Sequence, residues 1–146
     1  MEKEIRHSIH IHATPEQVWD TLTNPDKIEQ YMYGSRPLTD WHAGSPIDYY
    51  MDKEGEDVGV VKGMIIKADK SKYLAYTLFP IGWEGLEDVP ENYLTNTYQI
   101  TPAGDGADLT IAMSDFTKVG FGEQRYKHTA SSFEEWIAKI KEVAEK

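Results

Sequence analysis

The sequence contains no cysteine among its 146 residues. This excludes disulfide bonds, thiolate catalysis, iron–sulfur clusters and cysteine-based zinc sites, and it is compatible with a reducing cytoplasm. Basic residues are also scarce, since 15 Lys and Arg stand against 25 Asp and Glu, for a formal net charge of −10. Nucleic acids and anionic membranes are bound by basic patches, so we expect neither as a partner.

Long apolar runs are absent as well. No run approaches the roughly 18 residues that a transmembrane helix needs, and residues 1–13 lack the continuous apolar segment of a signal peptide. We therefore expect a cytoplasmic protein. Four Trp, nine Tyr and four Phe supply a large aromatic core, and the length predicts a single domain spanning residues 1–146.

The first half of the chain carries clear start signals. Residues 4–12 alternate apolar and polar side chains, which predicts a half-buried strand. Thr14, with proline after it and Gln17 at the capping-box position, starts a short helix that ends near Leu22. A second short helix is predicted over residues 26–31, after the break at Asn24-Pro25.

Sheet signals dominate the middle of the chain, where alternating segments are separated by turn residues. Strands are predicted over residues 47–51, 58–68, 73–79, 92–101 and 107–114. The segment 80–90 between two of them is a loop of rim or lid length.

Residues 122–146 have the pattern of one long amphipathic helix. Apolar side chains recur three and four residues apart, and the opposite face is charged. Ser131 to Glu134 has a capping-box pattern inside this helix, which predicts a break or hinge near Thr129. Only this helix is long enough to cover the apolar face of the sheet, so we predict an α+β helix-grip fold: a curved antiparallel sheet of about six strands around the C-terminal helix, with two short helices after strand one.

Several motifs in this order resemble the START-like (SRPBCC, Bet v 1-like) superfamily, and more narrowly the branch similar to the C-terminal domain of the activator of the heat-shock-protein-90 ATPase. They are Ile9-x-Ile11-x-Ala13-Thr14-Pro15-Glu16-Gln17-Val18-Trp19, Leu22 to Ile28, Trp41-x-x-Gly44-Ser45-Pro46-Ile47, Tyr98-x-Ile100-x-Pro102-x-Gly104, and Phe133-x-x-Trp136-x-x-x-Ile140. One departure is Tyr31-Met32, where the family commonly has a Trp-Phe type pair. The resemblance implies a helix-grip fold with a cavity between sheet and C-terminal helix, used in relatives for lipids, hormones or polyketides.

The histidines and the acidic residues are the candidates for a metal-binding or catalytic site. His10 and His12 lie on one strand face about 6.5–7 Å apart, within reach of a shared metal, but a third ligand is not evident, and we interpret the pair as polar surface. The acidic turn 52–57 lacks the frame of an EF-hand calcium loop. No nucleophile elbow, zinc-protease helix or phosphate-binding loop occurs. We therefore predict no catalytic residues, no metal and no cofactor.

The strand and helix phases point a set of mostly aromatic and Met side chains inward or toward the expected cavity mouth. The cavity candidates are Trp41, Tyr49, Met51, Met64, Phe79, Trp83, Asn96, Tyr98, Met113, Tyr126, Phe133 and Trp136. Asn96 stands out because a polar group on an apolar strand face is costly when buried dry and unpaired.

The leading hypothesis is a non-catalytic domain that binds a small apolar or aromatic ligand in this cavity. Two alternatives stay open. One is a protein-interaction module with a partner such as a chaperone, which the nearest branch suggests. The other is an enzyme resembling polyketide cyclases, in which Tyr, His and Asp side chains lining the cavity act as acids and bases.

Overall fold

A computed structural model describes residues 3–146. Its strands are β1 (Ile5–Ile11), β2 (Arg36–Leu38), β3 (Pro46–Lys53), β4 (Glu56–Asp69), β5 (Tyr73–Pro80), β6 (Leu94–Ala103) and β7 (Gly106–Met113). Its α-helices are α1 (Pro15–Thr23), α2 (Pro25–Tyr31) and α3 (Gly122–Ala144), with short 3-10 helices η1 (Pro90–Asn92) and η2 (Phe116–Lys118). Among the helices of residues 3–146, none combines the length and apolar character that crossing a membrane requires.

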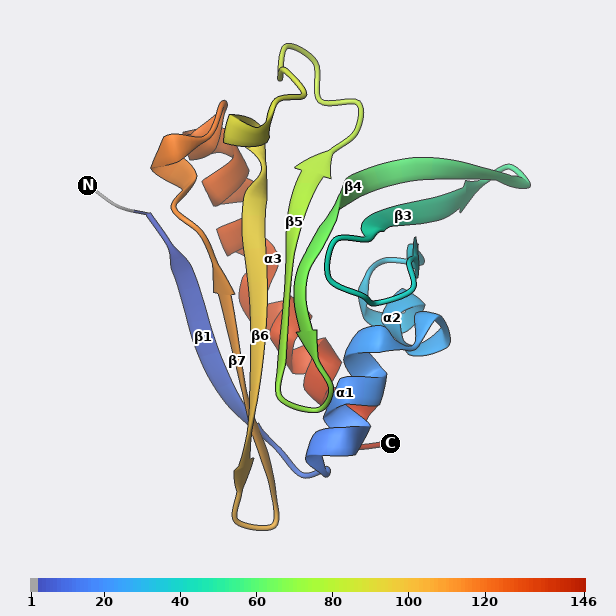
Figure 1. Cartoon of the computed structure of the whole chain (residues 1–146), viewed down its shortest axis with the longest axis vertical. Helices are drawn as coiled ribbons and strands as arrows, with labels where there is room; N and C mark the ends of the chain where they lie inside the picture. The colour runs from blue at the N-terminus through green and yellow to red at the C-terminus, as the bar shows by residue number, and fades with distance from the viewer. Residues whose placement is uncertain (1–2) are drawn as a thin grey trace.

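The strands form a seven-stranded antiparallel sheet in the order β1-β7-β6-β5-β4-β3-β2. The sheet curves, and α3 lies across its inner face while α1 and α2 close one end (Figure 1). This confirms the predicted helix-grip fold. The seventh strand, β2, was not predicted because its three residues are too short to show an alternating pattern, and it pairs with the outer edge of β3.

Side-chain caps fix the two short helices as the sequence predicted. The Thr14 hydroxyl accepts a hydrogen bond from the Gln17 backbone N–H at 3.1 Å, and the Gln17 side chain accepts one from the Thr14 N–H at 2.8 Å. Asn24 ends α1 and caps α2, since its side-chain oxygen accepts from the Asp26 N–H at 3.0 Å. Both helices therefore begin where a proline follows a polar cap.

The predicted hinge in the last helix is wrong, because α3 is uninterrupted from Gly122 to Ala144. The Ser131 hydroxyl donates a hydrogen bond to the His128 carbonyl, in the preceding turn of the same helix, at 2.9 Å. It therefore does not cap the start of a new helix. This mode of bonding is common for Ser in a helix interior. The apolar face of α3 is buried on the sheet side just after the expected break, at Phe133, Ile137 and Ile140. This burial favours a continuous helix.

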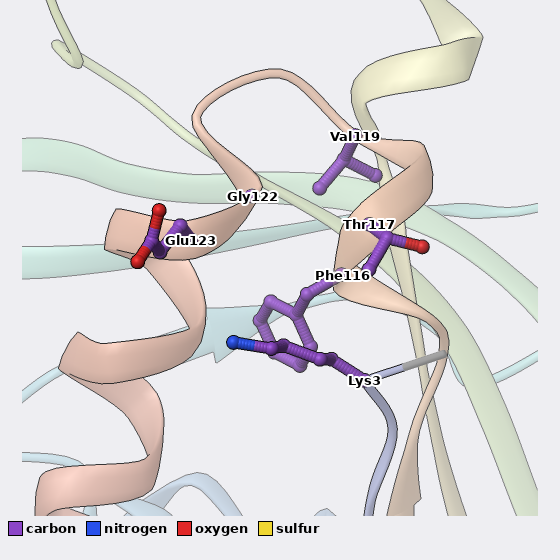
Figure 2. A pocket seen from close by; sticks show the side chains of 6 residues that line it. All are labelled: Lys3, Phe116, Thr117, Val119, Gly122 and Glu123. Atoms are coloured by element: carbon purple, nitrogen blue, oxygen red, sulfur yellow. The ribbon is translucent and has the colours of Figure 1, made fainter. Parts of the chain in front are cut away.

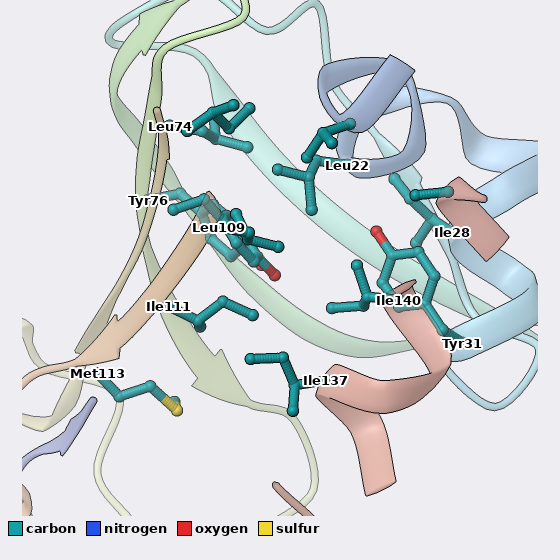
Figure 3. Close-up of a cluster of buried hydrophobic side chains, with 14 of the residues drawn as sticks. Leu22, Ile28, Tyr31, Leu74, Tyr76, Leu109, Ile111, Met113, Ile137 and Ile140 are labelled. Carbon is teal, nitrogen blue, oxygen red and sulfur yellow. The ribbon is translucent and has the colours of Figure 1, made fainter. Parts of the chain in front are cut away.

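The core lies between the sheet and the three helices (Figure 3). Leu109 and Ile111 of β7 face Ile137 and Ile140 of α3, and all four are at most 2% exposed. Leu22 and Ile28 bring α1 and α2 into the same cluster. At the edge of this packed region, Tyr76 and Met113 also border an unfilled volume.

Two β-bulges bend the outer half of the sheet. In the pairing with β3, Tyr49 lies opposite Val61 and Tyr50 opposite Gly59, so Val60 is an extra residue in β4. Ile66 is likewise extra in the pairing with β5. A bulge bends the strand and shifts the alternation of its side chains, so the β3–β4 pair curves over the end of the sheet (Figure 1).

Candidate ligand-binding cavity

A cavity of about 430 Å³ lies between the curved sheet and the middle of α3. Five strands contribute to its wall, together with α3 and the segment after α2. The lining residues are Met32, Tyr33, Ser35, Tyr49, Met51, Val60, Val61, Tyr76, Leu78, Asn96, Met113, His128, Thr129, Ser132, Phe133 and Trp136. The volume falls in the range of small-molecule sites, roughly 300–1,000 Å³, and most of the lining is apolar.

Three buried tyrosines and one asparagine form a polar cluster at the wall of the cavity. The Tyr49 hydroxyl donates to the Tyr76 hydroxyl at 3.2 Å, and the Tyr98 hydroxyl lies 3.4 Å from Tyr76. The Asn96 amide Nδ2 donates to the same Tyr76 oxygen at 3.1 Å. The Tyr76 hydroxyl is therefore the hub that connects strands β3, β5 and β6.

The Asn96 side chain is only half satisfied. Asn96 is 3% exposed, and its Oδ1 atom has no hydrogen-bond partner in the described residues. A buried acceptor without a partner costs about 1–3 kcal/mol. Because Asn96 lines the cavity, this unpartnered acceptor belongs to a residue of the cavity wall.

Burial sets the protonation of the phenols at this site. Desolvation raises the pKa of Tyr49 and that of Tyr98 well above the ordinary value, and the neighbouring Tyr76 adds to the effect in both cases. The hydroxyls therefore stay neutral at any physiological pH. They act as hydrogen-bonding groups and not as bases.

The α3 side of the cavity is held by sulfur and aromatic contacts. The Trp136 indole Nε1 donates to the Met32 sulfur at 3.1 Å, which joins α3 to the end of α2. The Trp136 ring lies 5.4 Å from Phe133 and 6.3 Å from Tyr98, measured between centroids. These contacts join Met32, Phe133, Trp136 and Tyr98 into one aromatic wall.

Half of the twelve predicted cavity residues line this volume: Tyr49, Met51, Asn96, Met113, Phe133 and Trp136. Tyr98 lies directly behind the wall, against Tyr76 and Trp136. Trp41 is half-buried against the core in the loop before β3.

The remaining four lie elsewhere. Phe79 stacks on Tyr93 at 5.0 Å, and Tyr126 packs edge-on against Phe116 at 5.5 Å. Trp83, in the 80–90 loop, lies 5.9 Å from Phe121. Met64 is 53% exposed on the outer face of the sheet, so its expected inward orientation is wrong.

The bulge at Val60 explains both the misplacement of Met64 and the place of Val61 in the lining. An unbroken alternation through β4 keeps Val60 and Met64 on one face. With the extra residue, Val60 and Val61 both reach the cavity, and Ile65 takes the inward position next to Met64. A polar helix face is normally exposed to solvent, and for this reason three polar lining residues of α3 were not predicted: His128, Thr129 and Ser132.

A second pocket, of about 340 Å³, lies where α3 begins (Figure 2). Lys3 and Glu123 are its charged lining residues. The Lys3 ammonium lies over the Tyr126 ring at 5.1 Å, and Glu123 forms an ion pair with Lys127 at 3.2 Å. Both charges are thus already engaged, and the cavity at Asn96 is the stronger candidate site.

A curved sheet that closes on a long C-terminal helix, with a cavity between them, defines a START-like helix-grip domain. The match to a family model then narrows the class: the chain belongs to the Activator of Hsp90 ATPase homolog 1-like protein family, which it matches over residues 12–145. The fold and the family are those of ligand-binding or interaction domains. No curated protein matches the chain.

Solved structures have the same fold. A solution structure from Cytophaga hutchinsonii is 27% identical, with a TM-score of 0.75 over 97% of this chain and 93% of that chain. The Aha1 dimer from Colwellia psychrerythraea is 16% identical, with a TM-score of 0.73 over 98% and 96% of the two chains. A protein from Mesorhizobium loti is 17% identical, with a TM-score of 0.73 over 97% and 96%.

Proposed function

We propose that the protein binds a small apolar or aromatic molecule that carries one hydrogen-bond donor, in the cavity between the sheet and α3. The observation that carries the proposal is the unpartnered Oδ1 of Asn96, buried beside a cavity of about 430 Å³. An apolar volume with one unmet acceptor selects for a ligand of matching shape and for a donor at one position.

Acid–base catalysis requires a second ionisable group beside the first. The described lining of the cavity contains one imidazole, His128, and no carboxylate. Burial raises the pKa of Tyr49 and that of Tyr98, so these two phenols are neutral. Binding is therefore the activity that this geometry supports best.

The test uses two fluorescent probes that differ at one hydrogen-bond donor. N-phenyl-1-naphthylamine is neutral, aromatic and carries a single N–H, and its N-methyl derivative lacks that donor. We expect both to gain fluorescence on binding, with the N–H probe about tenfold tighter, because a hydrogen bond to a buried acceptor contributes about 1–3 kcal/mol. Equal affinities, or no fluorescence gain with either probe, would overturn the proposal.

Two variants on strand β6 serve as a matched pair. Asn96→Leu removes the acceptor and should abolish the difference between the probes. Thr97→Val makes the same kind of polar-to-apolar change on the opposite face of β6, where Thr97 is partly exposed, and should leave the difference intact.

A protein-interaction role is the second candidate, and the family match favours it. The acidic 80–90 loop is the surface we would test. Within this loop, Asp88 forms an ion pair with Lys62 and accepts a hydrogen bond from the Tyr93 hydroxyl. Glu84 and Glu87 are exposed. A cellular partner that is captured by Trp136→Ala protein but lost after reversing the charges of Glu84 and Glu87 would support this role over ligand binding.

A further inference from the structure

Three potential metal ligands converge at the end of the sheet opposite the cavity. His10 lies in β1, His12 follows β1, and Asp105 lies in the turn between β6 and β7, which Figure 1 shows beside the end of β1. The Asp105 Oδ1 atom is 3.6 Å from His10 Nε2 and 3.8 Å from His12 Nδ1. All three ligand atoms lie within 4.8 Å of one another.

These spacings are close to those around a bound transition metal. A zinc ion with bonds of about 2.0–2.1 Å in tetrahedral geometry has its ligand atoms about 3.3–3.5 Å apart. The two distances to Asp105 are only a few tenths of an ångström longer. All three atoms lie within 4.8 Å of one another, and the side chains are at least partly exposed, so rotations of these side chains would bring the atoms onto one ion.

Asp108 orients the first of these ligands. Its carboxylate is 2.8 Å from His10 Nδ1, and the two residues are directly opposite in the β1–β7 pairing. A proton held on Nδ1 by this carboxylate leaves Nε2, which lies 3.6 Å from Asp105 Oδ1, with its lone pair free to bind a metal. Metal-binding histidines are commonly oriented by a carboxylate in this way.

The end of α3 fixes the backbone that carries both histidines. The Glu145 carboxylate accepts a hydrogen bond from the His12 backbone N–H at 2.8 Å. The Lys141 ammonium donates to the His10 carbonyl, also at 2.8 Å, and pairs with Glu145. The two imidazoles are thus presented from a strand that is hydrogen-bonded on one side to β7 and anchored on the other to α3.

We propose that His10, His12 and Asp105 bind a divalent transition metal ion, with Zn²⁺ as the best fit, and that Asp108 positions His10. Two imidazoles and one carboxylate suit zinc and its neighbours better than calcium or magnesium, which take oxygen ligands. The fourth position is open to water. Such an ion joins the end of β1 to the β6–β7 turn.

The test is a calorimetric titration of the untagged full chain with Zn²⁺, together with the visible absorption of the Co²⁺ form. The pKa of His10 is raised, first by the hydrogen bond to Asp108, so the titration is run near pH 8 to keep the imidazole neutral. We expect one equivalent to bind and the Co²⁺ spectrum to indicate a four-coordinate site.

Variants distinguish a specific metal-binding site from two histidines that lie close together by chance. His10→Ala, His12→Ala and Asp105→Asn should each weaken binding at least tenfold, and Asp108→Asn should keep the stoichiometry while weakening binding about 10–100-fold. His42→Ala and His128→Ala, at histidines outside the cluster, should change nothing. Unchanged affinity in Asp105→Asn or His12→Ala, or binding of several equivalents, would overturn the proposal.

Discussion

Asn96 combines a stability cost and a proposed role in binding within one side chain. Its Nδ2 atom is paired with Tyr76, whereas its Oδ1 atom is buried without a partner. An apolar side chain of similar volume removes both polar atoms at once. With Asn at this position, the free protein bears the unfavourable free energy of a buried, unpaired acceptor. Ligand binding would offset that free energy by supplying a donor.

The Asn96→Leu variant should therefore be as stable as the wild type or more stable. Loss of one hydrogen bond, about 1 kcal/mol, is offset by removal of an unpaired acceptor that costs about 1–3 kcal/mol. Urea unfolding followed by circular dichroism measures the difference, with Thr97→Val as the control. A loss of more than about 2 kcal/mol would show that Oδ1 is satisfied in the free protein.

Asp115 holds the chain at the entry to η2. One oxygen of its carboxylate accepts three hydrogen bonds: from the Lys3 backbone N–H at 2.9 Å, from the Thr117 backbone N–H at 2.9 Å and from the Thr117 hydroxyl at 2.7 Å. These bonds, with that from the Lys3 N–H the strongest, lower the pKa of Asp115 from 3.8 to about 2. The ionised form is thus favoured in the folded state.

The sign of the pH effect follows from that direction. A carboxyl whose pKa is lower in the folded state contributes stability that is complete above its unfolded pKa and is lost as the pH falls through the folded value. Asp115→Asn should therefore lower the urea midpoint at pH 7, and the gap to wild type should close as the pH falls from about 4 toward 2. The exposed Asp57→Asn is the control. A gap independent of pH would contradict the assignment.

At the scale of elements, strand β4 shows where sequence patterns reach their limit. Its approximate extent follows from turn residues and alternation, and a strand over residues 58–68 was predicted where β4 spans Glu56–Asp69. The extra residues at Val60 and Ile66 were not, because a bulge is selected by the curvature of the whole sheet and leaves no fixed local signal. Every inward or outward assignment beyond a bulge is then reversed, as for Met64.

Gly63 marks a close approach between β4 and β5. A Cβ atom added there would lie 1.7 Å from the Thr77 carbonyl oxygen, which is backbone and cannot rotate away. Gly63→Ala should therefore destabilise the fold by about 1–3 kcal/mol or more.

Gly59→Ala, four residues earlier in β4, provides the matched control. The added Cβ meets the end of the Ile81 side chain at 3.3 Å, which can move. We expect a change in unfolding free energy within about 0.5–1 kcal/mol. Thermal and urea unfolding compare the two variants, and equal effects would argue against close strand approach at Gly63.

Helix α3 contains a buried charge that its sequence pattern does not reveal. Arg125 is 4% exposed, and its Nη1 donates to the Asn92 carbonyl at 2.8 Å. Arg125 lies eight residues before Phe133 on the same helix face. An arginine in a helix normally predicts a position exposed to solvent, so the pattern does not indicate burial here. Its bonding partners, the carbonyls of Asn92 and Gly120, lie in the connections outside α3, and such connections carry no periodic pattern.

At the scale of the whole molecule, the parts predicted from sequence are those with a local physical cause. Capping residues defined α1 and α2, and alternation defined most of the strands. The sequence predicted a cavity between the sheet and α3, but the lining of the volume found there depends on strand register and helix rotation. The approach of Asp105 to His10 and His12 likewise requires β1 to pair with β7, which residues about 95 apart in sequence cannot reveal by spacing.

The two proposed sites lie at opposite ends of β7. Met113 borders the cavity, whereas Asp105 lies in the turn that precedes β7, so the sites are about 25 Å apart along the strand. Sites separated by more than about 10 Å, with no shared partners, usually act additively within about 0.3–0.5 kcal/mol. Saturating Zn²⁺ should therefore change the dissociation constant of N-phenyl-1-naphthylamine by less than about twofold.

The measurement is a probe titration with and without Zn²⁺, repeated in His12→Ala protein, where the metal should have no effect at all. Linkage gives an internal check, because the probe must change zinc affinity by the same factor as zinc changes probe affinity. A change of fivefold or more in both directions would mean that β1, β7 and α3 transmit a conformational change between the ends of the sheet. That outcome would replace the view of two independent sites by one of a coupled pair.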